Sequence, residues 1–153
     1  MSKTVPTSVT LGTRGSPLAL LQTYDVRDRL IAANPGLTVE IAEITVVGDQ
    51  IQDRALAEVG GKGLFTKELD RAIMDGRCDA AVHSMKDVET WLSEGISLTC
   101  VLKREDVRDA FLSHKADSLE ALPPGSKVGT SSLRRKAQIL AKRPDLEVVL
   151  FRG

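Results

Sequence analysis

Charged and hydroxyl side chains occur where apolar segments end in this chain of 153 residues. The segment Ala80–Val88 runs from small and branched apolar residues to the pair Lys86–Asp87. This pattern predicts a buried parallel strand with the charged pair at its carboxyl end, where ligands bind in open α/β sheets. An aspartate beside a lysine stays ionised and can hold N–H groups or stabilise positive charge. A structural ion pair is the alternative.

Two predicted junctions between a strand and a helix add hydroxyl and guanidinium groups. The first contains Arg14 and Ser16, which would add donors to the backbone N–H groups at a helix start. The second, residues 129–135, reads Gly-Thr-Ser-Ser-Leu-Arg-Arg. Residues 127–153 hold seven basic side chains against two acidic ones, so this part is predicted to bind a polyanion. A capped helix and a solvated basic helix, without any ligand, are the alternatives at the two junctions.

Composition narrows the class of protein. The formal net charge is zero and only 3% of the residues are aromatic, which argues against a nucleic-acid-binding protein. No apolar run approaches the roughly 18 residues of a membrane span, and the first residues lack a signal-peptide pattern, so a cytoplasmic location is expected. The two cysteines, Cys78 and Cys100, are predicted to be buried free thiols. They and the two histidines lack the spacing of a metal site, so no metal is expected.

Strand and helix patterns alternate along the chain. The predicted strands are Ser8–Gly12, Leu37–Val47, Asp79–His83, Ile96–Leu102, Ala110–Ser113, Lys127–Thr130 and Leu146–Phe151. The predicted helices start at Ser16-Pro17, at about Thr66 and after Ser132, with a helical turn at Ser118–Leu122. This alternation predicts an α/β fold with mixed, mostly parallel sheets. The charged run 103–109 suggests a crossing between a first lobe, residues 1–102, and part of a second, residues 103–153.

Five stretches together closely resemble the hydroxymethylbilane synthase family, whose members are also called porphobilinogen deaminases. They are long, lie in family order and span nearly the whole chain: Thr13–Gln22, Val59–Leu69, Ala81–Val88, Arg104–Phe111 and Val128–Arg135. The resemblance implies a transferase of tetrapyrrole (heme and porphyrin) biosynthesis that condenses four porphobilinogen molecules into hydroxymethylbilane and releases ammonia. It also implies two lobes like those of the type II periplasmic binding proteins, plus a small third domain. A dipyrromethane cofactor is fixed covalently to a cysteine of that third domain.

The resemblance assigns roles to individual residues. Asp87 matches the catalytic aspartate that holds pyrrole N–H groups and stabilises the cationic azafulvene intermediate. The positions that match cofactor-binding residues are Lys86, Asp87, Thr130, Ser131, Ser132, Arg134 and Arg135. The positions that match groups around the incoming substrate are Arg14, Ser16, Gln22, Ser84 and Arg152. The expected partners are therefore porphobilinogen and the growing oligopyrrole, with neither nucleic acid nor membrane.

The sequence also departs from the family pattern. Glu58 stands where relatives often carry lysine, and Glu89 stands where many have proline, which predicts a looser segment there. Neither cysteine lies in a context like that of the cofactor cysteine, so the chain is expected to be the N-terminal portion of the enzyme: an incomplete second lobe, no third domain and, alone, no activity. The complete protein is expected to be a monomer, and this portion to self-associate through exposed sheet edges. The alternative function is a non-catalytic module that binds carboxylates.

Overall fold

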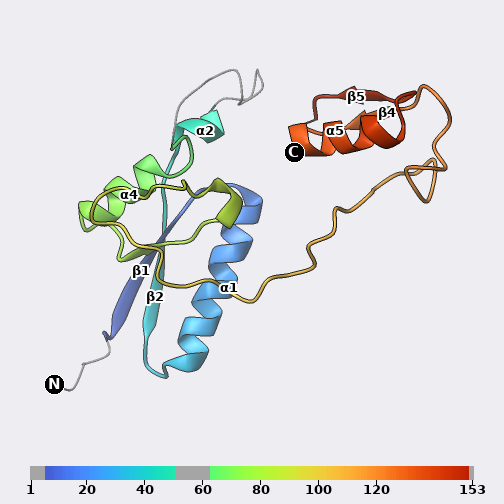
Figure 1. The fold of residues 1–153 in the computed structure, drawn as a ribbon. Coiled ribbons are helices and arrows are strands. Elements are labelled where there is room, and N and C mark those ends of the chain that lie inside the picture. Colours follow the sequence, from blue (N-terminus) through green and yellow to red (C-terminus); the bar gives the residue numbers. More distant parts are fainter. Residues whose placement is uncertain (1–5, 51–62, 152–153) are drawn as a thin grey trace. The chain divides into compact units, whose positions relative to one another are not determined.

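The computed structural model describes residues 6–50 and 63–151 and divides the chain into two compact units, Met1–Thr99 and Cys100–Gly153. Each unit contains a small parallel sheet with at least one helix (Figure 1). The prediction of an α/β fold with parallel sheets is confirmed. No helix of the described part is long and apolar enough to cross a membrane.

The first unit is built around β1 (Ser8–Thr13), the central strand of a three-stranded sheet ordered β2-β1-β3. Its β-branched residues favour extended backbone, and β2 (Thr38–Glu43) pairs with it in parallel from Ser8↔Thr38 to Thr13↔Glu43. On the other side lies β3 (Ala80–Ala81), also parallel. Because parallel strands of one sheet end at the same edge, residues that follow β1 and β3 become neighbours.

Two helices pack on this sheet. The first, α1 (Pro17–Ala33), contacts β1 and β2, and α4 (Lys67–Met74) contacts β1 and β3 (Figure 1). A short helix, α2 (Val47–Gln50), follows β2, and the 3-10 helix η1 (Met85–Asp87) follows β3. The largest fully buried side chains of the unit are Leu69, Val46, Thr13 and Thr23.

The second unit contains β4 (Lys127–Gly129) and β5 (Glu147–Val149), which pair in parallel, and α5 (Leu133–Lys142) between them. Ser132 caps α5, because its side chain accepts a hydrogen bond from the Arg135 N–H. Within the described part of the second unit, the only buried apolar residues are Leu122 and Leu146. The guanidinium of Arg143 holds the preceding turn, donating to the carbonyl oxygens of Leu119, Glu120 and Leu122 at 2.9 Å each.

Several local predictions are wrong. The segments 96–102 and 110–113 form no strand, and the chain from η1 to β4 carries neither helix nor strand (yellow to orange in Figure 1). A strand requires a neighbour to take up its N–H and C=O groups, and neither segment has one. Where a helical turn was predicted at Ser118–Leu122, the chain forms one hydrogen-bonded turn, with the Leu122 N–H donating to the Leu119 carbonyl oxygen at 3.4 Å.

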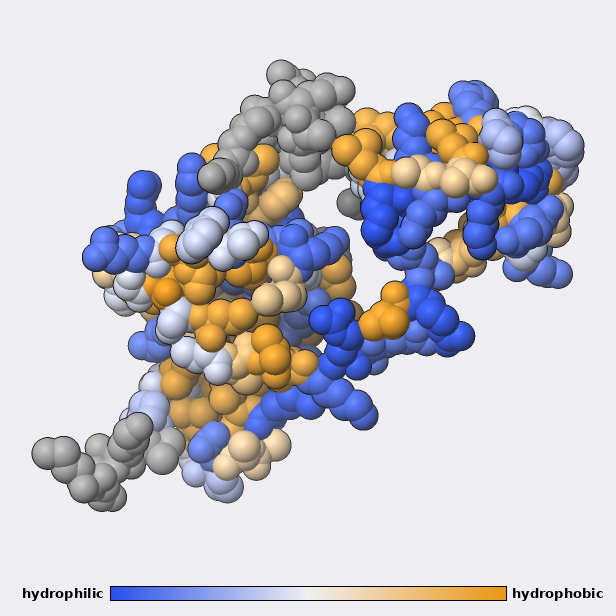
Figure 2. Space-filling view, viewed as in Figure 1, coloured by the Kyte–Doolittle hydropathy of each residue, from blue (hydrophilic) through white to orange (hydrophobic). Residues whose placement is uncertain are grey.

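Burial also differs from the sequence prediction. Cys100 is exposed, because its segment is unpaired, whereas Cys78 is buried as expected. The Ala80–Val88 segment is a buried strand only in outline: β3 spans two residues at the sheet edge and Ala80 is exposed. The predicted apolar face of α1 is only half covered, with Leu18 and Leu21 exposed. Figure 2 shows such apolar residues reaching the surface of the first unit.

Candidate active site

Arg14 and Asp87 meet at the carboxyl edge of the first sheet. Arg14 directly follows β1, and Asp87 ends η1, a few residues after β3. The Arg14 Nη1 donates to Asp87 Oδ2 at 3.2 Å, and the two side chains are only 16% and 21% exposed. The two residues are neighbours because β1 and β3 are parallel and end at the same edge of the sheet. Lys86, by contrast, is exposed.

Arg14 has a second carboxylate partner, which the sequence did not reveal. Its Nε donates to Asp49 Oδ2 at 3.0 Å, and its Nη2 contacts Asp49 Oδ1. The hydrogen bonds that Arg14 donates to Asp49 are the main cause that raises the pKa of Arg14, and burial opposes this effect. The Phe65 ring covers the guanidinium, 4.1 Å from the Arg14 Cζ to the ring centroid. The two carboxylates thus hold the edge of the Arg14 guanidinium, and the Phe65 ring covers its face.

Gly48 makes this arrangement possible. A Cβ atom at this position would lie 2.3 Å from Phe65 Cε1 and 2.8 Å from the carbonyl oxygen of Leu64. The Gly48 N–H also donates to the Leu64 carbonyl at 2.9 Å. Because only glycine leaves this space, α2 can approach the Leu64–Phe65 backbone closely enough to place Asp49 and the Phe65 ring around one guanidinium.

Glu89, two residues after Asp87, forms a hydrogen bond with the segment that precedes Phe65. Its carboxylate accepts a hydrogen bond from the Gly63 N–H, where Gly63 has the left-handed φ of 75°. Proline at this position could not make this contact, because it has no side-chain acceptor; the expected looser segment stays a prediction. Glu58, the other departure from the family pattern, lies outside the described residues.

Gln22 and Ser84 form a second pair at this edge. The Ser84 hydroxyl donates to Gln22 Oε1 at 2.8 Å, which joins α1 to the residue before η1. Ser16 occupies the N-cap position of α1 as predicted, and Pro17 follows it. Its side chain makes no capping hydrogen bond, however, contrary to the expected capping hydroxyl.

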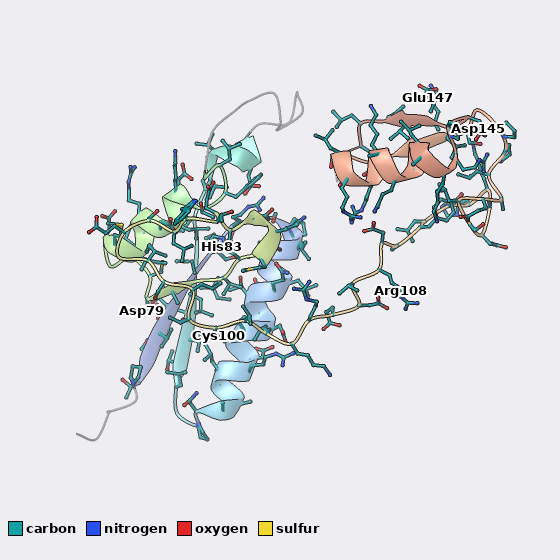
Figure 3. The ribbon with its side chains drawn as sticks, in the orientation of Figure 1. Asp79, His83, Cys100, Arg108, Asp145 and Glu147 are labelled. Carbon is teal, nitrogen blue, oxygen red and sulfur yellow. The ribbon has the colours of Figure 1, made fainter. Side chains whose placement is uncertain are left out.

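His83 lies between β3 and η1, half-buried among the charged groups of the site (Figure 3). Burial is the main cause that lowers its pKa below 6.5, and the positive charge of Arg14 acts in the same direction. Asp70 and Asp87 oppose this effect. The imidazole is therefore neutral at pH 7 and adds no positive charge beside Asp87.

The second unit presents two arginines to one carboxylate. Arg134 donates Nη1 and Nη2 to the two oxygens of Asp109, at 2.9 Å each, and Arg135 donates Nε to Asp109 Oδ1 at 2.9 Å. These contacts lower the pKa of Asp109 to about 2, mainly through the hydrogen bonds from Arg134. Asp109 lies in the charged run that the sequence suggested was only a crossing.

Thr130 and Ser132, at the start of α5, form hydrogen bonds with the backbone around the helix N-terminus. The Thr130 hydroxyl accepts from the Ser132 N–H at 3.2 Å, the Ser132 hydroxyl caps the helix, and Ser131 is exposed. Exposed guanidinium forks already occupied by a carboxylate fit a ligand with carboxylate side chains. Arg152, the last predicted substrate residue, lies outside the described residues.

The site residues predicted from the sequence fall in both units. The first holds Arg14, Ser16, Gln22, Ser84, Lys86 and Asp87, and the second holds Thr130, Ser131, Ser132, Arg134 and Arg135. Three contributing residues were missed: Asp49, Phe65 and Asp109. Only Asp109 carried a signal, since it follows closely spaced basic residues. Among the described residues, no group of three or more histidine, cysteine, aspartate or glutamate side chains could hold a metal ion.

Comparison with known proteins agrees with this chemistry. Residues 9–153 match the family model described as "Porphobilinogen deaminase, dipyromethane cofactor binding domain". A curated relative, the chloroplastic porphobilinogen deaminase of Oryza sativa subsp. japonica, is 58% identical over 149 residues, which is 95% of this chain. The chain spans 42% of the length of that relative.

The comparison overturns one expectation. A cytoplasmic location was predicted from the sequence, but the rice relative, which is 58% identical, is named chloroplastic, and this finding contradicts the prediction. The prediction relied on the absence of a recognisable targeting pattern, which is weak evidence because transit peptides lack a single strong signature.

Proposed function

We propose, because this chain belongs to the porphobilinogen deaminase family, that its residues serve the condensation of porphobilinogen into hydroxymethylbilane with release of ammonia. The observation that carries this proposal is the pair Arg14–Asp87: a partly buried carboxylate at the edge of a parallel sheet, held by one guanidinium nitrogen. The matched domain binds a dipyrromethane cofactor, and porphobilinogen is the proposed substrate.

Asp87 is the proposed catalytic residue. Its carboxylate can accept hydrogen bonds from pyrrole N–H groups and stabilise positive charge that develops on the ring when ammonia leaves. The incoming substrate would be oriented by Gln22, Ser84, Ser16 and Arg152. Fixed donors and acceptors of this kind contribute to catalysis because they need no reorganisation during the reaction.

Lys86 and the residues of the α5 junction would hold the cofactor, with Arg134 and Arg135 binding its carboxylates. When bound, dipyrromethane supplies the primer to which pyrroles are added. Cys78 is unsuited to covalent attachment, because it is buried and burial raises the pKa of its thiol. Cys100 is exposed, but neither cysteine has the sequence context of the family's cofactor cysteine. We propose that the attachment cysteine lies in a further domain, and that the two units correspond to lobes of the periplasmic-binding-protein type.

The second candidate is a carboxylate-binding module without catalysis. One observation favours it: Arg134 and Arg135 both bind the exposed carboxylate of Asp109, an arrangement that can receive a carboxylate without any chemistry. The two candidates differ in their dependence on Asp87, since a module needs the arginines and no central carboxylate.

Ammonia release from porphobilinogen distinguishes them. We expect Asp87→Asn to lower turnover by about 100-fold or more while porphobilinogen is still bound, because a neutral amide cannot stabilise the developing cation. The experiment should use this chain joined to the remaining C-terminal part of the rice relative, which would supply the cofactor cysteine, because the 153-residue portion alone is expected to be inactive. Asp25→Asn, on the exposed side of α1, is the control. Binding of porphobilinogen without ammonia release by this joined protein would favour the module.

A further inference from the structure

Arg14 divides its donors unequally between two carboxylates. Asp49 receives Nε and Nη2, the fork that binds both oxygens of a carboxylate, whereas Asp87 receives only Nη1 on one oxygen, Oδ2. Within residues 6–50 and 63–151 the structure contains no other hydrogen bond to the Asp87 carboxylate. One oxygen of Asp87 is consequently available to a ligand in the described part.

This division is not what the charges alone would produce. A guanidinium forms its strongest contact when two parallel N–H groups face the two oxygens of a carboxylate. Without a competitor, Arg14 would turn that fork toward Asp87 and engage both of its oxygens. Asp49 occupies the fork, and the Phe65 ring at 4.1 Å restricts rotation of the guanidinium plane.

We propose that Asp49 is a positioning residue, which keeps the Arg14 fork away from Asp87 so that one Asp87 oxygen stays free for pyrrole N–H groups. The role rests on the proposed function of Asp87. The role does not require Arg14 to bind substrate carboxylates, since Asp49 occupies the Arg14 fork in this structure. If Arg14 instead binds those carboxylates, Asp49 competes with the substrate, and its removal has the opposite effect.

The sign of one substitution separates these possibilities. Calorimetry with porphobilinogen on the 153-residue chain should show binding weakened by about tenfold in Asp49→Asn, the cost of one charge-assisted hydrogen bond. In the Arg14→Lys background the same substitution should change binding by less than about twofold, because a lysine has no fork to turn. The matched control is Asp25→Asn, since Asp25 pairs with Arg29 at 2.9 Å on exposed α1.

A second readout does not depend on binding. In nitrogen-15 spectra, the Arg14 Nε–H peak can be assigned because the substitution Arg14→Lys removes it. We expect Asp49→Asn to move this peak toward the position of solvated arginines. The control Asp25→Asn should leave the peak in place. Tighter porphobilinogen binding in Asp49→Asn, equal losses in both backgrounds, or an unmoved peak would each overturn the positioning role. An unsubstituted chain that binds no porphobilinogen contradicts the proposed function, and the spectra alone then decide the contact.

Discussion

The two units use the same chemistry, arginine against aspartate, in different surroundings. In the first, the Arg14 side chain is 16% exposed and is held by two carboxylates and a ring. In the second, Arg134 and Arg135 are 57% and 51% exposed and share the single carboxylate of Asp109. Exposed ion pairs contribute little to stability and exchange with solvent ions, whereas partly buried ones fix geometry.

The difference indicates a division of tasks. A partly buried, fully occupied guanidinium suits the orientation of a fixed group such as Asp87. Exposed forks that hold an exchangeable carboxylate suit reception of a ligand that brings carboxylates of its own. We expect substitutions in the first cluster to affect folding and substitutions in the second to affect mainly binding.

Gly48→Ala should have the largest effect on the buried cluster. The added methyl group would meet the Phe65 ring at 2.3 Å and the Leu64 carbonyl at 2.8 Å, so the ring or the backbone must move. Overpacking of this kind costs about 1–3 kcal/mol of unfolding free energy, measurable by urea denaturation. Gly15→Ala is the control, because its new atom would meet only the flexible Glu43 side chain at 3.2 Å. Equal losses in the two variants would contradict this account of Gly48.

The pH dependence of stability should come next, through His83. Its pKa is lowered in the folded state, so below pH 6.5 the unfolded chain takes up the proton more readily. Stability therefore falls as the pH drops through 6.5, and His83→Gln should flatten this part of the profile. Denaturation midpoints at pH 7.5 and 5.5 measure the effect. His114→Gln, in the exposed part of the second unit, should leave the slope unchanged.

Asp109→Asn should have the smallest effect on folding and a visible one on binding. The variant loses an exposed ion pair, so its unfolding midpoint at pH 7 should hardly change. Succinate, a simple dicarboxylate, should bind about two- to fivefold tighter, because it no longer competes with Asp109 for the two guanidiniums. Asp145→Asn, which removes an ion pair of Arg143 elsewhere in the unit, is the control. Weaker succinate binding would show that Asp109 orders the arginines instead.

The pKa of Asp109 determines the pH below which its ion pairs with Arg134 and Arg135 are lost. Asp109 has a folded pKa of about 2 against an ordinary value of 3.8, so its contribution is present above pH 3.8 and is lost as the pH falls toward 2. Between pH 5 and 8 the second cluster should not respond to pH, in contrast to His83 in the first unit. Chemical-shift titration of the Asp109 carboxyl carbon would measure this directly.

The sequence by itself determined the local features of this protein. Strand and helix patterns predicted the bounds of β1, α1, α4, α5, β4 and β5 within a few residues. These elements are predictable because capping residues and apolar periodicity act locally. The roles proposed for Asp87 and the arginines come from their match to the family motifs. Strands predicted at 96–102 and 110–113 failed, because strand formation depends on a neighbour that the pattern does not specify.

Tertiary structure decided which charges meet. Arg14, Asp49 and Asp87 lie far apart in sequence and converge because β1 and β3 end at one edge while α2 follows β2. Nothing in the local sequence around Asp49 indicates that it takes the Arg14 fork, nor that Asp109 occupies Arg134 and Arg135. Residue type fixes what a group can bind; only the path of the chain through the fold fixes which partner it reaches.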